Sequence, residues 1–151
     1  MTVLSGQTIR RMGVFTPFFE RTVHNGMTYG LGPAGYDVRI DQQVMLSKVS
    51  RAVLASTVEH FNMPSDCIAY VKDKSTWARR FVLVQNTVIE PGWRGFLTLE
   101  ITYEGGGIEI IDKGSPIAQI VFHRLDEPCE SPYSGKYQDQ DRGPQIAVDE
   151  K

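Results

Sequence analysis

Short apolar segments with a period of two, separated by closely spaced turn residues, fill most of the chain after residue 35. They are expected as strands at 36–40, 53–58, 68–71, 81–84, 96–103 and 116–122. In 96–103, Leu97, Leu99, Ile101 and Tyr103 alternate with polar residues, among them Glu100, so the two sets lie on opposite faces. Many short strands with close turns predict an all-β fold, a sandwich or a barrel.

Breaker residues define the rest of the expected local structure. Ser5 can cap a short helix over 7–12 that ends at Gly13. Residues 13–35 are dense in glycine and proline and are expected as loops and short extended pieces. The glycine-rich segment 104–107 predicts a hairpin that joins strand 96–103 to a strand over 108–111.

Bulk properties exclude several classes of protein. A chain of 151 residues is expected as one domain over 1–151, with a polar tail at about 133–151 that is mobile unless a ligand orders it. A net charge of −2 argues against a nucleic-acid or membrane surface, and no apolar run approaches the ~20 residues that span a bilayer. The start of the chain does not resemble a signal peptide, and Cys67 and Cys129 are not paired in a CxxC motif. A cytoplasmic location with reduced thiols is therefore expected.

Basic and hydroxyl residues gather at 72–80. If Ser75 begins a helix, Ser75 and Arg79 lie at i and i+4 and offer a hydroxyl and a guanidinium to one ligand. The simpler interpretation of such a cluster is a solvated helix face. A second segment, 86–100, carries Glu90 and Glu100, which alone would be a turn carboxylate and a solvated strand residue. Together the two segments suggest a nucleotide site with a carboxylate for acid–base chemistry.

Zinc-dependent nucleobase deaminases carry HxE and PCxxC signatures. In this chain Pro128-Cys129 is followed by Glu130, Ser131 and Pro132, so the second cysteine is lacking. The histidines are scattered, and no glutamate follows any of them at the required spacing (His24, His60 and His123). The sequence therefore predicts chemistry without zinc.

Several motifs occur in a fixed order. Lys74 to Arg79 reads Lys-Ser-Thr-Trp-Ala-Arg, 89–95 reads Ile-Glu-Pro-Gly-Trp-Arg-Gly, and Leu99-Glu100 follows. Gly-Tyr-Asp-Val-Arg at 35–39, Gly-Ser-Pro-Ile-Ala-Gln at 114–119 and Gly-Lys-Tyr-Gln-Asp-Gln at 135–140 complete the set. In these motifs the chain resembles the dCTP deaminase branch of the trimeric dUTPase superfamily from about Leu4 to about Gln140.

The resemblance implies a distorted dUTPase-like β-barrel with short helices, assembled as a homotrimer whose sites are shared between subunits. It implies a deoxynucleoside triphosphate ligand, dCTP or dUTP, with Mg²⁺ held mainly by the triphosphate and not by protein ligands. Glu100 would be the general base that activates water for attack on C4 of cytosine. Ser75 would hold the water or its oxyanion, and Arg79 would stabilise charge near Glu100.

The resemblance also implies a set of nucleotide contacts. Lys74 and Thr76 would meet the phosphates from one side, and Lys136, Gln140 and Tyr133 from the tail. The remaining residues assigned to nucleotide binding are Asn86, Thr87, Glu90 and Gln119.

This chain departs from the family pattern beside the base. The segment between Arg79 and Pro91 is shorter than in the longer deaminases, Val88 stands where many carry a basic residue, and Glu90 replaces the usual Asp. Asn86 and Thr87 are therefore expected to take over roles beside the base that other residues have in the longer deaminases.

Three functions follow from these patterns. The leading one is a zinc-independent dCTP deaminase that makes dUTP and ammonia, with dTTP as a possible inhibitor. The alternative is a dUTPase, or a bifunctional enzyme giving dUMP and pyrophosphate, with Glu90 as base and Mg²⁺ as Lewis acid. A third is a nucleotide-sensing trimer without catalysis. Glu100 favours the first, because C4 deamination needs such a carboxylate and dUTP hydrolysis does not.

Overall fold

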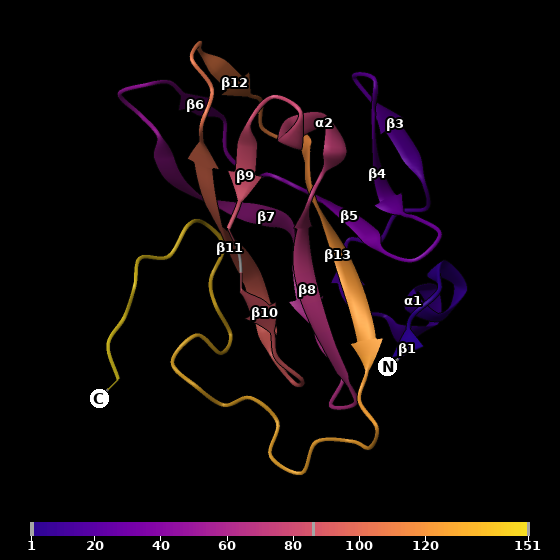
Figure 1. Cartoon of the computed structure of the whole chain (residues 1–151). Helices are drawn as coiled ribbons and strands as arrows, with labels where there is room; N and C mark the ends of the chain where they lie inside the picture. Colours follow the sequence, from indigo (N-terminus) through magenta and orange to yellow (C-terminus); the bar gives the residue numbers. More distant parts are fainter. Residues whose placement is uncertain (1, 86, 151) are drawn as a thin grey trace.

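The computed structural model describes residues 2–85 and 87–150, and this part of the chain contains many more strand residues than helix residues (Figure 1). The first half contains β1 (Thr2–Val3), α1 (Gly6–Met12), β2 (Phe15–Thr16), β3 (Thr22–His24), β4 (Met27–Leu31), β5 (Tyr36–Arg39), β6 (Val44–Leu46), β7 (Ala52–Asn62) and β8 (Cys67–Asp73). The second half contains α2 (Ser75–Ala78), β9 (Val82–Val84), β10 (Val88–Ile89), β11 (Arg94–Tyr103), β12 (Glu109–Ile111) and β13 (Pro116–Arg124). The predicted all-β fold is confirmed.

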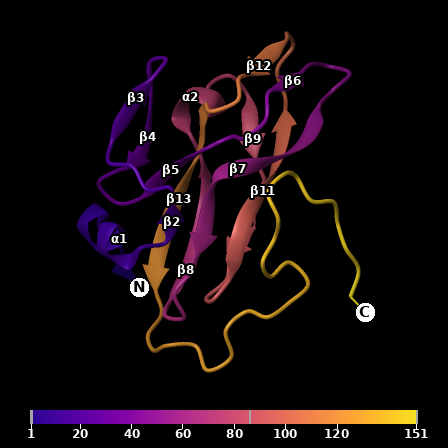
Figure 2. The ribbon, with the colours of Figure 1, turned by 180° about the vertical axis from the view of Figure 1, so that it is seen from behind.

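The described strands form three sheets. The largest has the order β10-β8-β13-β5-β4-β3, with β1 added to β13, and the second has the order β2-β7-β11-β9. The third is the pair β12-β6. An isolated antiparallel bridge joins Ile40, directly after β5, to Thr57 in the middle of β7. The strands curl around one core as a distorted β half-barrel, in agreement with the expected barrel (Figures 1 and 2).

The breaker residues act largely as expected. Ser5 is the N-cap of α1, and Gly13 ends that helix in the left-handed conformation at φ 66°. Asn25 and Gly26 both have positive φ and form the two-residue turn between β3 and β4, in which His24 pairs with Met27. Asn-Gly suits such a turn because both residues tolerate this conformation. The region 13–35 thus contains a hairpin as well as loops.

The predicted hairpin between 96–103 and 108–111 is wrong. β12 pairs with β6, while β11 pairs with β7 and β9. The ring of Tyr103 fills the space beside Gly105, where a Cβ would come within 2.3 Å of the Tyr103 hydroxyl oxygen. The Gly107 amide then donates to that hydroxyl at 3.2 Å. The glycines therefore wrap the chain over Tyr103 and lead it away from β11.

A buried ion pair lies inside the barrel between β5 and β7. The Arg39 side chain and its backbone amide both donate to the Glu59 carboxylate, at 2.8 and 2.9 Å, and Glu59 is fully buried. The Arg39 guanidinium also lies against the rings of Phe19 and Tyr29, 4.8 and 4.7 Å from their centroids. These contacts compensate the cost of removing the two charges from water.

The two ends of the chain lie on opposite sides of the molecule. The N-terminus is near β1 and α1, whereas the segment after β13 passes below the sheets and climbs along β11 (Figures 1 and 2). This segment makes a parallel bridge between Gln140 and Gly95. We call residues 133–150 the tail. In Figure 1, α2 lies toward the end of the molecule that holds β12, while β10 and most of the tail lie toward the other end.

Candidate active site

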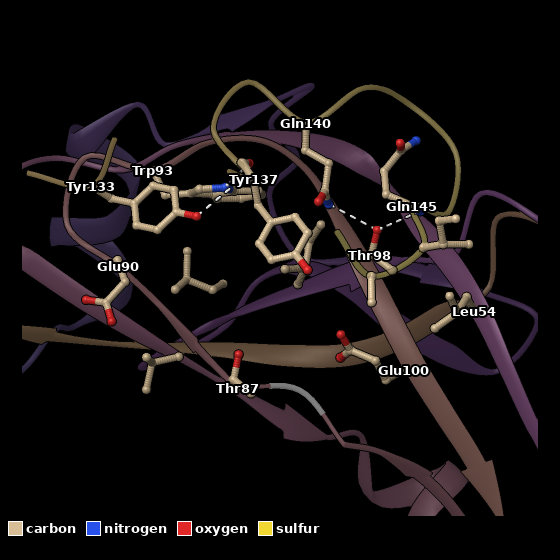
Figure 3. Close-up of a pocket in the computed structure, with 15 residues that line it drawn as sticks. Leu54, Thr87, Glu90, Trp93, Thr98, Glu100, Tyr133, Tyr137, Gln140 and Gln145 are labelled. Atoms are coloured by element: carbon tan, nitrogen blue, oxygen red, sulfur yellow. Dashed lines mark hydrogen bonds between the residues drawn. The ribbon is translucent and has the colours of Figure 1, made fainter. Parts of the chain in front are cut away.

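A pocket of ≈ 520 Å³ lies between β10, β11 and the tail (Figure 3). The close-up shows Thr87 and Glu100 on one side, facing Tyr133, Tyr137 and Gln140 on the other. The lining residues are Leu54, Thr87, Val88, Ile89, Glu90, Trp93, Leu97, Thr98, Glu100, Tyr133, Tyr137, Gln140, Gln145, Ile146 and Ala147. Most are apolar or aromatic, with a few polar groups among them, as is usual for a small-molecule site.

An irregularity in β11 presents three residues of this strand to the pocket. The register with β7 shifts between Phe96 and Thr98, and the Leu97 amide donates to the Thr57 hydroxyl at 3.0 Å. A β-bulge re-aims side chains in this way. Leu97 therefore lines the pocket together with Thr98 and Glu100, although simple alternation places it on the opposite face.

Glu100 has the environment of a proton acceptor. Its side chain is exposed and lines the pocket, yet neighbouring protein atoms remove part of its water. This desolvation raises the pKa of the Glu100 carboxyl, and a backbone hydrogen bond opposes the change. A carboxylate with a raised pKa is a stronger base than an ordinary one, which suits general base catalysis.

The tail forms the far wall of the pocket through specific hydrogen bonds. The Trp93 indole N–H donates to the Tyr137 carbonyl at 2.7 Å, and the Tyr137 amide donates to the Tyr133 hydroxyl at 3.1 Å. The Gln140 side-chain amide donates to the Phe96 carbonyl at 2.8 Å. These bonds fix two aromatic rings of the tail beside Trp93.

Thr98 holds two residues of the tail on β11. Its hydroxyl oxygen accepts from the Gln140 side chain at 3.0 Å and from the Gln145 backbone amide at 3.1 Å. The side chain of Thr98 is nearly buried, so both bonds are shielded from water. The tail is therefore placed two residues away from Glu100 along the same strand.

The predicted site residues fall into two groups. Thr87, Glu90, Glu100, Tyr133 and Gln140 all line the pocket. Asn86 lies outside the described residues.

The second group belongs to α2 and its surroundings. Lys74, Ser75, Thr76 and Arg79 are absent from the described lining of the pocket. The helix does begin at Ser75, and the Arg79 amide donates to the Ser75 carbonyl at 3.1 Å, so their predicted i, i+4 relation holds. Both residues are exposed.

Two predicted phosphate ligands already have partners of opposite charge. The Lys74 ammonium is 2.8 Å from the Asp37 carboxylate and donates to the Thr28 hydroxyl at 3.3 Å. The Lys136 ammonium lies 3.5 Å from the Glu150 carboxylate. Gln119, also predicted to bind nucleotide, lies on β13 opposite Asp37 and away from the pocket.

Sequence reasoning missed several residues of the pocket. Trp93 and Tyr137 stand inside motifs that the sequence analysis quoted, so their position in those motifs was an available signal. Thr98 shares the polar face of β11 with Glu100, which was a second signal. Ile89 also belongs to the 89–95 motif, and Val88 directly precedes it. The remaining missed residues are apolar or belong to the far tail, where no pattern marks them: Leu54, Leu97, Gln145, Ile146 and Ala147.

In the part of the chain that the structure describes, no group of three or more His, Cys, Asp or Glu side chains is arranged to hold a metal ion. The pocket carries two carboxylates, Glu90 and Glu100. This donor set fits Mg²⁺ bound mainly through substrate phosphates, because Mg²⁺ commonly keeps waters and takes few protein ligands.

No described helix is long and apolar enough to cross a bilayer.

Comparison with known proteins assigns the family. The family model described as dCTP deaminase-like matches residues 37–125. A dCTP deaminase of Acidobacterium capsulatum is 31% identical, with 93% of this chain and 96% of that protein aligned. The chain therefore belongs to the dCTP deaminase-like family.

Solved structures agree on the fold. The 2'-deoxycytidine 5'-triphosphate deaminase of Agrobacterium tumefaciens superposes with a TM-score of 0.61 at 19% identity, covering 82% of this chain and 47% of that chain. The native dUTPase of EIAV superposes with a TM-score of 0.59 at 18% identity, covering 82% of this chain and 97% of that chain. The expected dUTPase-like fold is confirmed.

Proposed function

We propose that this protein is a zinc-independent dCTP deaminase, which converts dCTP and water to dUTP and ammonia. The observation that carries the proposal is Glu100, whose carboxyl has a raised pKa and lines a pocket large enough for a nucleoside. Family membership supplies the second support, because the relatives that align over most of the chain are dCTP deaminases.

Glu100 acts as the general base in this reaction. It takes a proton from water while the water oxygen attacks C4 of cytosine, and the tetrahedral intermediate keeps the departing amino group. The carboxyl gives this proton to N3 of cytosine, then takes the hydroxyl proton of the tetrahedral intermediate and delivers it to the amino group, so that ammonia departs and a carbonyl forms at C4. The apolar wall made by Leu54, Val88 and Ile89 limits competing water around the base.

A second copy of the chain completes the site in this proposal. Ser75 and Arg79 are exposed on α2 and do not line the pocket of their own chain. In a homotrimer with shared sites, α2 of a neighbouring subunit supplies the Ser75 hydroxyl for the attacking water and the Arg79 guanidinium for charge near Glu100. Lys74 and Thr76 reach the phosphates from the same helix.

The tail and Mg²⁺ bind the triphosphate. Tyr133, Lys136 and Gln140 belong to the tail, and Lys136 exchanges Glu150 for phosphate when the nucleotide arrives. Mg²⁺ bound to the phosphates would neutralise part of their charge. Thr87, which lines the pocket, contacts the base side of the nucleotide in place of the residues that the shorter segment lacks.

A second candidate, hydrolysis of dUTP or of dCTP to dUMP, is favoured by one observation. Glu90 lines the same pocket as Glu100, so a carboxylate is available to activate water near the phosphates.

A cytoplasmic location is part of the proposal. Cys67 and Cys129 are both free thiols, which suits the reducing cytoplasm, and either reaction is compatible with that location.

The proposal is tested with Glu100→Gln and a matched control, Glu104→Gln, which removes an exposed carboxyl just beyond the end of β11. Ammonia release from dCTP and equilibrium binding of dCTP are measured for both variants. Glu100→Gln should lose deamination and keep binding, whereas Glu104→Gln should retain both. Ammonia release by Glu100→Gln at the wild-type rate would overturn the assignment.

A further inference from the structure

We propose that Arg142 is a positioning residue, whose ion pair with Asp41 holds the tail on β11 and so forms the pocket wall before nucleotide binds. The inference rests on the proposed function for its kinetic consequence, but its structural part stands without it. Asp41 follows β5 in the sequence and Arg142 belongs to the tail, so the pair joins segments that are 101 residues apart.

The geometry of this pair is bidentate. Arg142 Nε donates to Asp41 Oδ2 at 2.9 Å, and Arg142 Nη2 donates to Asp41 Oδ1 at 3.1 Å. The Asp41 side chain is only 8% exposed, so water competes poorly for its oxygens. The guanidinium keeps the pKa of Asp41 below its ordinary value, and the carboxylate therefore stays ionised at neutral pH. Two parallel charge-assisted bonds fix orientation as well as distance.

Neighbouring contacts join Arg142 and Gly143 to further strands, and we call these two residues and their contacts the latch. The Gly143 amide donates to the Ser56 hydroxyl at 3.2 Å, and Ser56 is buried on β7. The Arg142 guanidinium also lies 5.7 Å from the centroid of the Phe96 ring on β11. One arginine and the residue after it thus bind the tail to both central strands of the second sheet.

Residues on both sides of this latch line the pocket. Gln140 precedes Arg142 by two positions and Gln145 follows it by three, and both bind Thr98. A fixed Arg142 therefore sets the positions of both glutamines and of the following Ile146 at the pocket. Ordering the tail in advance removes a conformational cost that nucleotide binding would otherwise meet.

Lys113 provides a matched control because it faces the same carboxylate from another segment. Its ammonium is 3.7 Å from Asp41 Oδ1, and its side chain is 68% exposed in the turn between β12 and β13. Lys113→Gln removes a positive charge near Asp41 without touching the tail. Arg142→Gln removes a positive charge of the same size together with both hydrogen bonds to the tail.

The test measures steady-state kinetics with dCTP and Mg²⁺ and the quenching of tryptophan fluorescence by acrylamide in the absence of nucleotide. Trp93 reports the position of the tail, because its indole N–H binds the Tyr137 carbonyl, while Trp77 is buried in α2 and serves as a constant background. In Arg142→Gln we expect stronger quenching and a KM raised about tenfold, with kcat changed less than about twofold. Lys113→Gln should match the wild type in all three quantities.

Two results would overturn the inference. One is equal KM values and equal quenching for Arg142→Gln and the wild type. The other is the same change in both variants, which would make the effect one of charge around Asp41 and not of the tail. A wild-type protein that fails to turn over dCTP would refute the proposed function, and the quenching comparison would still decide whether Arg142 holds the tail.

Discussion

Gly95 is the position where a single added methyl group should separate the tail from the pocket. It forms the parallel bridge with Gln140 of the tail, and its φ of 142° suits glycine and few other residues. A Cβ at Gly95 would lie 2.6 Å from the Gln140 backbone nitrogen and 3.0 Å from the Gln140 carbonyl oxygen. Because these are backbone atoms, Gly95→Ala cannot be accommodated by turning a side chain.

The magnitude follows from the bonds that this displacement breaks. The Phe96 amide donates to the Gln140 carbonyl at 3.0 Å, and the Asp139 amide donates to the Arg94 carbonyl at 3.0 Å. At about 1 kcal/mol each, their loss weakens tail docking by about 2 kcal/mol. That free energy corresponds to a KM for dCTP raised by as much as about thirtyfold. The unfavourable φ of alanine costs the fold a further ~1–3 kcal/mol.

The assay compares Gly95→Ala with Gly114→Ala. Gly114 also has a positive φ, 87°, but nothing lies within 4 Å of its would-be Cβ. Both variants should lose thermal stability through backbone strain, while only Gly95→Ala should raise KM. A KM for Gly95→Ala within twofold of wild type, with both variants melting alike, would refute the role given to the tail.

Three further predictions follow. Desolvation raises the pKa of Glu100 in the folded protein, so the ionised form of Glu100 opposes folding. Glu100→Gln should therefore have a higher Tm than the wild type near pH 8, and this difference in Tm should disappear as the pH falls below the ordinary glutamate pKa. A difference in Tm that is constant between pH 4 and pH 8 would contradict this. Trp77→Phe should cost about 1–3 kcal/mol in urea unfolding, because the buried Trp77 indole donates to the Pro116 carbonyl at 2.7 Å; a cost under about 0.5 kcal/mol would show that this bond does not anchor α2. Lys136→Ala should weaken dCTP binding while leaving Tm nearly unchanged, since its partners are Glu150 and the Tyr137 ring in the tail; a fall in Tm with unchanged affinity would contradict this.

The strands were predictable because apolar and polar residues alternate along a half-buried strand, and this alternation can be seen in the sequence. Tyr36, Leu99 and Ile101 alternate with polar residues and are all buried in the structure. Strand partners carry no such local signal. The glycines after β11 looked like a hairpin, and only the position of the Tyr103 ring decides that the chain turns toward β6.

The site was predictable where chemistry is concentrated in a motif, and not where it depends on distant contacts. Glu100 and Glu90 reach one pocket because β10 and β11 are close in sequence. Thr98 and Gln140 meet across 42 residues, and Asp41 and Arg142 across 101, which no local pattern encodes. The shift of register before Thr98 likewise places Leu97 in the wall of the pocket, whereas simple alternation would place it on the opposite face of β11.

The most direct measurement is the identity of the product. The purified protein is incubated with dCTP and Mg²⁺, with dUTP alone as a parallel substrate, and the nucleotides and pyrophosphate are resolved by ion-exchange chromatography. Accumulation of dUTP that remains intact, with one ammonia released for each dCTP consumed, is the result that the account predicts. Conversion to dUMP and pyrophosphate would mean that the protein also hydrolyses the triphosphate, with Glu90 as the base. An absence of turnover of either nucleotide would contradict the assignment of Glu100 as a catalytic base.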